Sequence, residues 1–226
     1  MSRPLRVSVT FLVGAALFVL VPLAAWGFAS VRAFAAERAR LAYLGAALGL
    51  NAFAAWRIPE IGRARPRAAT TVRRQHAVVV LLQVLSIAIV AAGPYTDART
   101  LAPLGGPALL RWLGLVMYVK GFLLMHLAEA ALGRQFSVEV AIQPEHALVT
   151  GGVYRHLRHP RYLGIIVFGA GIALVFDSLV ALGCAAAVVP LLLWRIADEE
   201  ALMRREFGPA WEAYRRRTWR LVPFVF

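Results

Sequence analysis

Long apolar runs alternate with short polar stretches along the whole chain. Divided at prolines, glycines and arginines, these runs predict six helices, at residues 7–31, 41–57, 77–93, 107–132, 161–176 and 179–196. An α-helix needs about 20 mainly apolar residues to cross a bilayer, and runs of this kind recur, which favours a helical bundle over a barrel of short strands. The pattern therefore predicts an all-α, polytopic membrane helical bundle with about six transmembrane helices.

The two ends of this pattern need separate interpretation. The first run follows Arg3 and Arg6 and resembles a secretory signal, but the apolar core of a signal spans roughly 7 to 15 residues, so we predict an uncleaved first transmembrane helix. Only Asp177 and Ser178 separate the last two runs, which predicts a tight C-terminal helical hairpin. Both helices of this hairpin are short for a full crossing.

Composition agrees with a membrane protein. Of the 226 residues, 60% are hydrophobic and 16% are charged, and the mean hydropathy is +0.66. This leaves too little polar surface to cover a soluble protein of this size. Cys184 is the only cysteine, so an intrachain disulfide and a cysteine-based metal site are both excluded. We interpret it as a small buried hydrophobe and predict no metal site.

The net charge of +13 would suit a nucleic-acid-binding protein, but the placement of the basic residues indicates a membrane protein. With both termini in the cytoplasm, nineteen of the 25 basic residues fall on cytoplasmic segments and Lys120 lies in the fourth helix. The outer loops then hold Arg32, Arg38, Arg40, Arg99 and Arg111. We predict anionic membrane lipids, and no nucleic acid, as partners. The high content of Ala, Arg and Leu suggests a bacterium with a GC-rich genome. We therefore predict that the protein lies in a bacterial inner membrane.

Polar residues suited to chemistry gather between the fourth and fifth predicted helices. The chain reads Leu132-Gly133, then Gln143, then His146-Ala147-Leu148-Val149-Thr150-Gly151-Gly152-Val153-Tyr154, then Arg158-His159-Pro160-Arg161-Tyr162-Leu163-Gly164. Proline is favoured in the first turn of a helix, so we expect Pro160 there, with His159 beside free backbone N–H groups. The two adjacent glycines permit a tight turn close to a ligand.

A second group of polar residues follows the predicted hairpin. Arg195 and Glu199 are four residues apart and share one helix face, so they either pair with each other or line a site together. Beyond Glu200, the sequence Gly208-Pro209 is expected to break the helix. The chain then continues through Trp211 and Tyr214 and ends near Arg220-Leu221-Val222-Pro223.

In this order, these motifs resemble the isoprenylcysteine carboxyl methyltransferase family and its bacterial phospholipid-methyltransferase-like relatives. The resemblance covers roughly residues 130–226 and implies an S-adenosylmethionine-dependent membrane enzyme. It divides the chain into N-terminal scaffold helices at 1–129 and a methyltransferase region at 130–226. It also implies a lipophilic or lipid-attached methyl acceptor. Protein prenylation is not expected in bacteria. The family name therefore does not identify the methyl acceptor of this chain.

The resemblance also implies roles for individual residues. Matching family positions contact the cofactor through His146, Ala147, Leu148, Val149, Tyr154, His159, Pro160, Arg161, Tyr162 and Glu199. Gln143 is a weaker match because its spacing is shorter, and Trp211 stands where Tyr is commoner. Arg195 matches an arginine that meets the substrate carboxylate. The catalytic candidates are therefore Arg195, Glu199 and His159.

The residue chemistry agrees with these roles. A sulfonium donor is positively charged, so Glu199 suits its amino group or ribose, whereas Arg195 suits an anionic acceptor. A carboxylate or thiolate acceptor needs no general base, and catalysis then depends on alignment in a site that excludes water. An amine acceptor needs a base, which His146 or His159 could supply.

Several alternatives remain at the level of the sequence. The enzyme could methylate a phospholipid amine or a small thiol, or it could be a membrane reductase that resembles sterol reductases and uses NADPH, although no G-x-G-x-x-G fingerprint is present. Structurally, His159 could cap a helix, and Arg195 with Glu199 could be an interfacial ion pair. We also expect His126 and Glu129, three residues apart, to form a local hydrogen-bonded pair.

Overall fold

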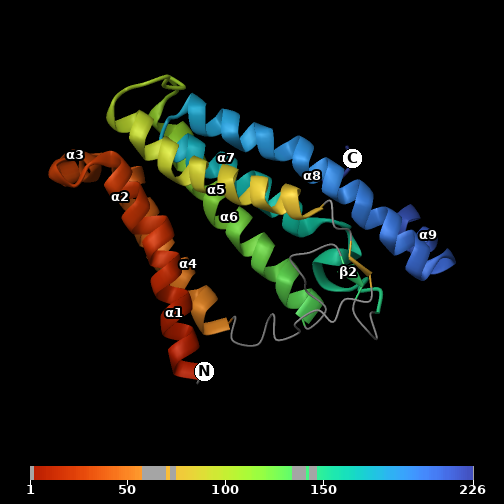
Figure 1. The fold of residues 1–226 in the computed structure, drawn as a ribbon. Helices are drawn as coiled ribbons and strands as arrows, with labels where there is room; N and C mark the ends of the chain where they lie inside the picture. Colours follow the sequence, from red (N-terminus) through yellow and green to blue (C-terminus); the bar gives the residue numbers. More distant parts are fainter. Residues whose placement is uncertain (1–2, 58–69, 72–74, 134–140, 143–146, 226) are drawn as a thin grey trace.

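The structure is a computed structural model that describes residues 3–57, 70–71, 75–133, 141–142 and 147–225. Within these residues the fold is a bundle of helices with one small two-stranded antiparallel sheet (Figure 1). Four helical segments are long and apolar enough to cross a membrane, namely Arg3–Trp26, Gln75–Ala98, Ala108–Leu132 and Leu179–Phe207. The prediction of an all-α membrane bundle is confirmed in these described segments.

The elements follow one another in a simple order. The N-terminal half contains α1 (Arg3–Ala15), η1 (Ala16–Leu20), α2 (Val21–Trp26), η2 (Phe28–Ser30), α3 (Val31–Ala36), α4 (Arg38–Arg57), β1 (Thr70–Thr71) and α5 (Gln75–Ala98). The C-terminal half contains α6 (Ala108–Leu132), β2 (Ala141–Ile142), η5 (Gly152–Arg155), α7 (Pro160–Val175), α8 (Leu179–Phe207) and α9 (Pro209–Arg216). The sheet pairs Thr70 with Ile142 and Thr71 with Ala141.

All six predicted helices are found, but the boundaries of three were wrong. The third helix, α5, continues past residue 93 to Ala98 with Pro94 inside it. The first helix ends at Trp26 rather than at residue 31, because Gly27 adopts a φ of 113° that a helix does not permit. The last hairpin helix, α8, continues past residue 196 to Phe207. Its added turns are polar, so hydropathy alone could not find them, although Ala, Glu, Leu, Met and Arg are good helix formers. The tight hairpin at Asp177 and Ser178 is confirmed.

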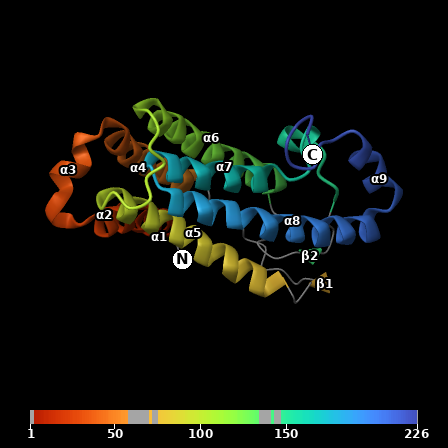
Figure 2. The same ribbon diagram turned by 90° about the horizontal axis from the view of Figure 1, so that it is seen from above.

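Helices α6 and α7 pack against each other through glycines. A Cβ atom added to Gly121 would lie 2.5 Å from the backbone nitrogen of Phe168, and one added to Gly171 would lie 2.4 Å from that of Tyr118. Small residues at such spacings let two helices approach closely in a membrane. Figure 2 shows α7 between α6 and α8, and this packing fixes the N-terminus of α7 relative to both neighbours.

The end of the bundle where α5 ends and α6 begins is held by ion pairs. Asp97 accepts hydrogen bonds from Arg40 Nε at 2.8 Å and from Arg111 Nη1 at 3.0 Å, and Arg111 also reaches Asp177 at 3.4 Å. Two of the five arginines predicted for the outer loops are thus neutralised by carboxylates. The polar residues of the resembling motifs lie at the other end, where α7 begins and α8 ends.

Candidate active site

His159 is the residue immediately before α7, and Pro160 is the first residue of that helix, as predicted. The imidazole makes no capping hydrogen bond to the helix, so the structural alternative that His159 serves as a side-chain cap is wrong. Instead, its Nε2 lies 3.3 Å from Glu200 Oε1 and its Nδ1 lies 3.5 Å from Glu199 Oε2. A histidine between two carboxylates is arranged to hold a proton on each ring nitrogen.

The surroundings of His159 favour its charged form. Burial alone would lower the pKa of His159, but the two adjacent carboxylates of Glu199 and Glu200 outweigh burial and raise that pKa above its ordinary value. The ring is only 7% exposed and stacks on Tyr162, with ring centroids 5.5 Å apart and planes 9° apart. The surroundings of the ring, two acidic residues and a tyrosine, therefore favour its protonated form.

Arg195 lies one turn before Glu199 on α8 and is 3% exposed. Its Nε donates a hydrogen bond of 2.7 Å to Tyr162 Oη, and its guanidinium carbon lies 5.9 Å from the centre of that ring. The structure thus joins Arg195, Tyr162, His159 and Glu199 in one continuous group at the junction of α7 and α8. This arrangement favours the interpretation that Arg195 and Glu199 line a site together.

Glu200 is a central residue that the sequence analysis did not select. Its carboxylate is 5% exposed and accepts hydrogen bonds from Arg158 Nε at 2.9 Å and from Arg220 Nη2 at 2.7 Å. Together with His159, these arginines surround it with three partners.

Tyr154 lies in the 3₁₀-helix η5 and is 8% exposed. Burial raises the pKa of Tyr154 above its ordinary range, so its hydroxyl stays neutral. Its carbonyl oxygen accepts a hydrogen bond of 2.8 Å from Tyr214 Oη on α9, and burial raises the pKa of Tyr214 to about 12. α9 follows the break at Gly208 and, with Trp211 also buried, packs over the segment that leads to His159.

The remaining predicted cofactor residues are placed as follows. Pro160 is buried, Ala147 is exposed, and Leu148 and Val149 are half-buried. Gln143 and His146 lie outside the described residues. Arg161 donates a hydrogen bond of 2.9 Å from its Nε to Glu129 on α6.

The expected pair of His126 and Glu129 is wrong. Glu129 pairs with Arg161 across the helix interface, whereas His126 Nδ1 lies 3.0 Å from the carbonyl of Phe122 and its ring stacks on that phenyl ring. A guanidinium opposite a carboxylate makes a stronger partner than an imidazole one turn away on the same helix.

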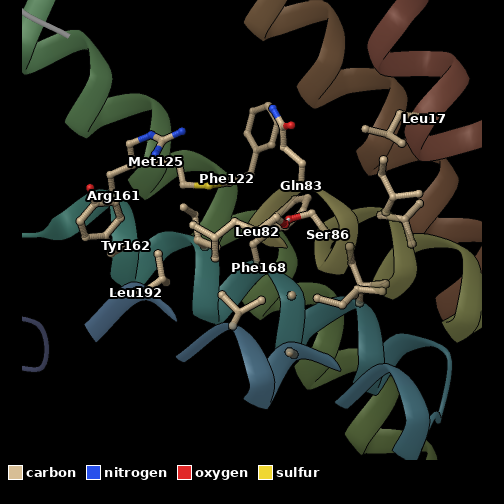
Figure 3. Close-up of a pocket in the computed structure, with 18 of the residues that line it drawn as sticks. Leu17, Leu82, Gln83, Ser86, Phe122, Met125, Arg161, Tyr162, Phe168 and Leu192 are labelled. Atoms are coloured by element: carbon tan, nitrogen blue, oxygen red, sulfur yellow. The ribbon is translucent and has the colours of Figure 1, made fainter. Parts of the chain in front are cut away.

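A cavity of about 630 Å³ begins beside Arg195 and extends between the helices. Arg161, Tyr162 and Arg195 supply polar groups, and Figure 3 shows Arg161 and Tyr162 on one side of the cavity and Leu17 of η1 on the other. The apolar part of the lining includes Leu82, Val90, Phe122, Ile165, Phe168 and Leu192. Gln83, Ser86 and His126 add polar groups to this mainly apolar lining. A mainly apolar pocket with two arginines at one end suits a lipophilic molecule with an anionic group.

This site lies largely within a stretch that resembles known proteins. Residues 112–205 match the model of the isoprenylcysteine carboxyl methyltransferase (ICMT) family. This match covers less than half of the chain, and over this region the chain is similar to the ICMT family. The family match includes His159, Tyr162, Arg195 and Glu199 but ends before Arg220.

Named proteins with similar sequences carry the same family description. The chain is 31% identical over 121 residues to a probable protein-S-isoprenylcysteine O-methyltransferase of Oryza sativa subsp. indica, a match that covers 50% of this chain and 61% of that protein. It is 34% identical over 115 residues to protein-S-isoprenylcysteine O-methyltransferase B of Arabidopsis thaliana, covering 50% of this chain and 58% of that protein. The chain thus matches less than two thirds of the length of these relatives.

The whole fold also resembles a solved ICMT structure. That of the eukaryotic intramembrane Ras methyltransferase superposes with a TM-score of 0.54 at 18% identity, and the match covers 99% of this chain and 75% of the other. At this identity the likeness concerns the fold. It extends to the N-terminal helices, which lie outside the motif resemblance at residues 130–226.

Proposed function

We propose that the chain is an S-adenosylmethionine-dependent membrane methyltransferase that esterifies a carboxylate on a lipophilic acceptor, as the isoprenylcysteine O-methyltransferases to which it is similar are named to do. One observation carries the proposal. Arg195 borders the cavity and, through Tyr162 and His159, also adjoins the half-buried carboxylate of Glu199. An anionic lipophilic acceptor and a cationic methyl donor could thus meet at one point.

The residues around Glu199 fit a cationic donor. Among the described residues, Glu199 Oε2 is a buried oxygen that accepts no hydrogen bond, although His159 Nδ1 lies 3.5 Å away. A buried acceptor without a partner is costly, and an amino or hydroxyl group of a ligand would satisfy it. We therefore assign Glu199, His159 and Tyr162 to the donor pocket. Pro160, Tyr154 and the stretch 146–149 are its further proposed walls.

Arg195 orients the acceptor in this proposal. S-adenosylmethionine, when bound, supplies an electrophilic methyl group on sulfonium sulfur, and its transfer to a carboxylate oxygen yields a methyl ester and a neutral thioether. The carboxylate is already the nucleophile, so His159 need not remove a proton and can remain charged. Arg195 holds the acceptor anion by charge-assisted hydrogen bonds, and the apolar walls of the cavity exclude water.

The helices before residue 130 act as the scaffold of this site, and residues 130–226 form the methyltransferase region. Leu17 and Phe18 of η1 nevertheless line the cavity, so the scaffold also shapes the space for the acceptor. We place the active site on the cytoplasmic side, together with both chain termini, in what we infer to be a bacterial inner membrane. Pairing of Arg40 and Arg111 with Asp97 supports this orientation, because it reduces the free positive charge at the opposite end.

Titration calorimetry of the purified protein in detergent with S-adenosylmethionine, and in parallel with NADPH, tests the donor. We expect binding of S-adenosylmethionine alone, and binding of NADPH alone would replace the proposal with a reductase. Radiolabelled methyl transfer to a prenylated cysteine carboxylate, an amine-headed phospholipid and an alkyl thiol then tests the acceptor. Activity restricted to the amine or the thiol would contradict the carboxylate assignment.

A further inference from the structure

The segment Thr218–Leu221, near the end of the chain, pairs with the backbone that leads into α7. Trp219 and Leu157 form an isolated parallel bridge. The backbone N–H of His159 donates to the carbonyl of Arg220 at 3.1 Å, and that of Arg158 donates to the carbonyl of Trp219 at 2.8 Å. We name the segment Thr218–Leu221 the C-terminal clasp. The clasp holds the main chain at His159, whose ring lies between Glu199 and Glu200.

Side chains extend this contact to the acidic residues of α8. Arg220 donates to Glu200 through Nη2 at 2.7 Å and through Nε at 3.2 Å, so it grips both carboxylate oxygens. Arg158 bonds to Glu200 through Nε and to the carbonyls of Arg215 and Thr218 through Nη1. Leu221, 5% exposed, packs in the hydrophobic core and anchors the end of the clasp.

We infer that the C-terminal clasp is a positioning element of the active site, and that Arg220 acts on donor binding through Glu200 rather than by touching the donor. This inference rests on the proposed function. Arg220 and Arg158 hold the Glu200 carboxylate, and Glu200 faces Nε2 of His159. The orientation of the imidazole, and with it the approach of Nδ1 to Glu199, is therefore set from the C-terminus.

The clasp lies outside the stretch that the family match covers, which ends at residue 205. The clasp follows the amphipathic helix α9, and its sequence alone does not indicate these contacts. The clasp differs from the neighbouring basic residues in its contacts, because Arg216 is exposed on α9 whereas Arg220 is committed to a buried carboxylate. Arg216 therefore provides a matched control for Arg220, because it has the same charge and lies four residues earlier in the sequence.

The first experiment compares S-adenosylmethionine affinity by calorimetry in wild type, Arg220→Ala, Arg220→Lys, Glu200→Gln and the double variant Arg220→Ala/Glu200→Gln. We expect Arg220→Ala to weaken binding by about tenfold, as the loss of a charge-assisted hydrogen bond predicts. Arg220→Lys should recover part of the affinity, since lysine keeps the charge but not the two-pronged contact. Arg216→Ala should bind as wild type does.

The double variant separates positioning from direct contact. If Arg220 acts through Glu200, removing it from the Glu200→Gln protein should cause little further loss. Full additivity of the two losses would overturn the inference, and so would wild-type affinity in Arg220→Ala.

A second measurement does not depend on the donor. Hydrogen exchange followed by mass spectrometry should show faster exchange of the peptide covering residues 156–160 in Arg220→Ala, with α5 and α6 unchanged. If the wild type binds no S-adenosylmethionine, the proposed function fails, while this exchange experiment still decides the clasp. Unchanged exchange at residues 156–160 would overturn the inference on its own.

Discussion

His159 Nδ1 lies 3.5 Å from Glu199 Oε2, which links the residue before α7 to the last turns of α8. The two residues are 40 positions apart in sequence. Their contact is made possible by the short hairpin at Asp177 and Ser178, which returns the chain alongside α7. Several consequences of this contact can be measured.

Loss of either partner should weaken donor binding without unfolding the protein. We expect Glu199→Gln and His159→Ala each to lower S-adenosylmethionine affinity by about tenfold or more. The first removes the negative charge proposed to hold the cationic donor, and the second removes the imidazole that lies against that carboxylate. Calorimetric titration measures the effect. Glu206→Gln and His156→Ala are matched controls, since both side chains are exposed on neighbouring turns. Unchanged affinity in both site variants would return these residues to structural roles.

The charge on His159 should make part of the stability pH-dependent. Its folded pKa lies above the ordinary 6.5, so its contribution is fully present below that pH and is lost as pH rises through the folded pKa. The difference in melting temperature between wild type and His159→Gln should therefore be largest in mildly acidic buffer and shrink in alkaline buffer. A difference that grows with pH would show that His159 is neutral in the folded protein.

The glycine contact between α6 and α7 should tolerate no side chain. Gly121→Ala places its new methyl group against the backbone of Phe168, so we expect a loss of about 1 to 3 kcal/mol in unfolding free energy. Gly183→Ala is the matched control, because a Cβ atom there meets no atom within 4 Å. That variant should be neutral or slightly stabilised, as alanine favours a helix. Equal melting temperatures for the two variants would contradict the tight α6–α7 contact.

Local sequence rules predicted much of this site. Pro160 in a first turn, the break at Gly208 and the shared face of Arg195 and Glu199 all follow from spacing within a few residues. The role of Glu200 could not be predicted in this way, because its partners Arg158 and Arg220 come from opposite sides of α8 in the sequence. No periodic pattern encodes a contact of that kind.

The same limitation explains the wrong pairing of His126 with Glu129. A spacing of three residues permits a helical pair, but Arg161 on α7 lies opposite Glu129 in space. The extent of α8 was missed for a different reason, since its last turns are polar and carry no hydropathy signal. Family resemblance supplied the roles of Arg195 and Glu199, which spacing alone had left open between an ion pair and a site.

Membrane orientation gives a further prediction. Reporter fusions after Phe226 and within residues 99–107 should report opposite sides of the membrane, with the C-terminus in the cytoplasm, because most arginines lie at that end. Alkaline phosphatase and fluorescent-protein fusions distinguish the two sides. Finding both reporters on one side would contradict six crossings.

The last prediction concerns Arg195 and the class of acceptor. If the acceptor is a carboxylate, Arg195→Ala removes charge-assisted hydrogen bonds of about 1.5 to 3 kcal/mol, so turnover should fall roughly ten- to hundredfold. Affinity for S-adenosylmethionine should hardly change. Arg195→Lys should remain impaired, because lysine restores the charge but neither the planar fork nor the contact of Nε with Tyr162 Oη.

An amine acceptor would give a different result for the same variants. A guanidinium gives no advantage to an amine, and Arg195 would then serve a lipid phosphate, for which lysine is an adequate substitute. Methyl transfer by wild type, Arg195→Lys and Arg195→Ala to a prenylated cysteine carboxylate and to an amine-headed phospholipid therefore separates the classes. Lysine rescue on the phospholipid would assign Arg195 to a phosphate. Full activity of Arg195→Ala on both acceptors would remove Arg195 from substrate binding, because a residue that orients the reacting group cannot be dispensable for its transfer.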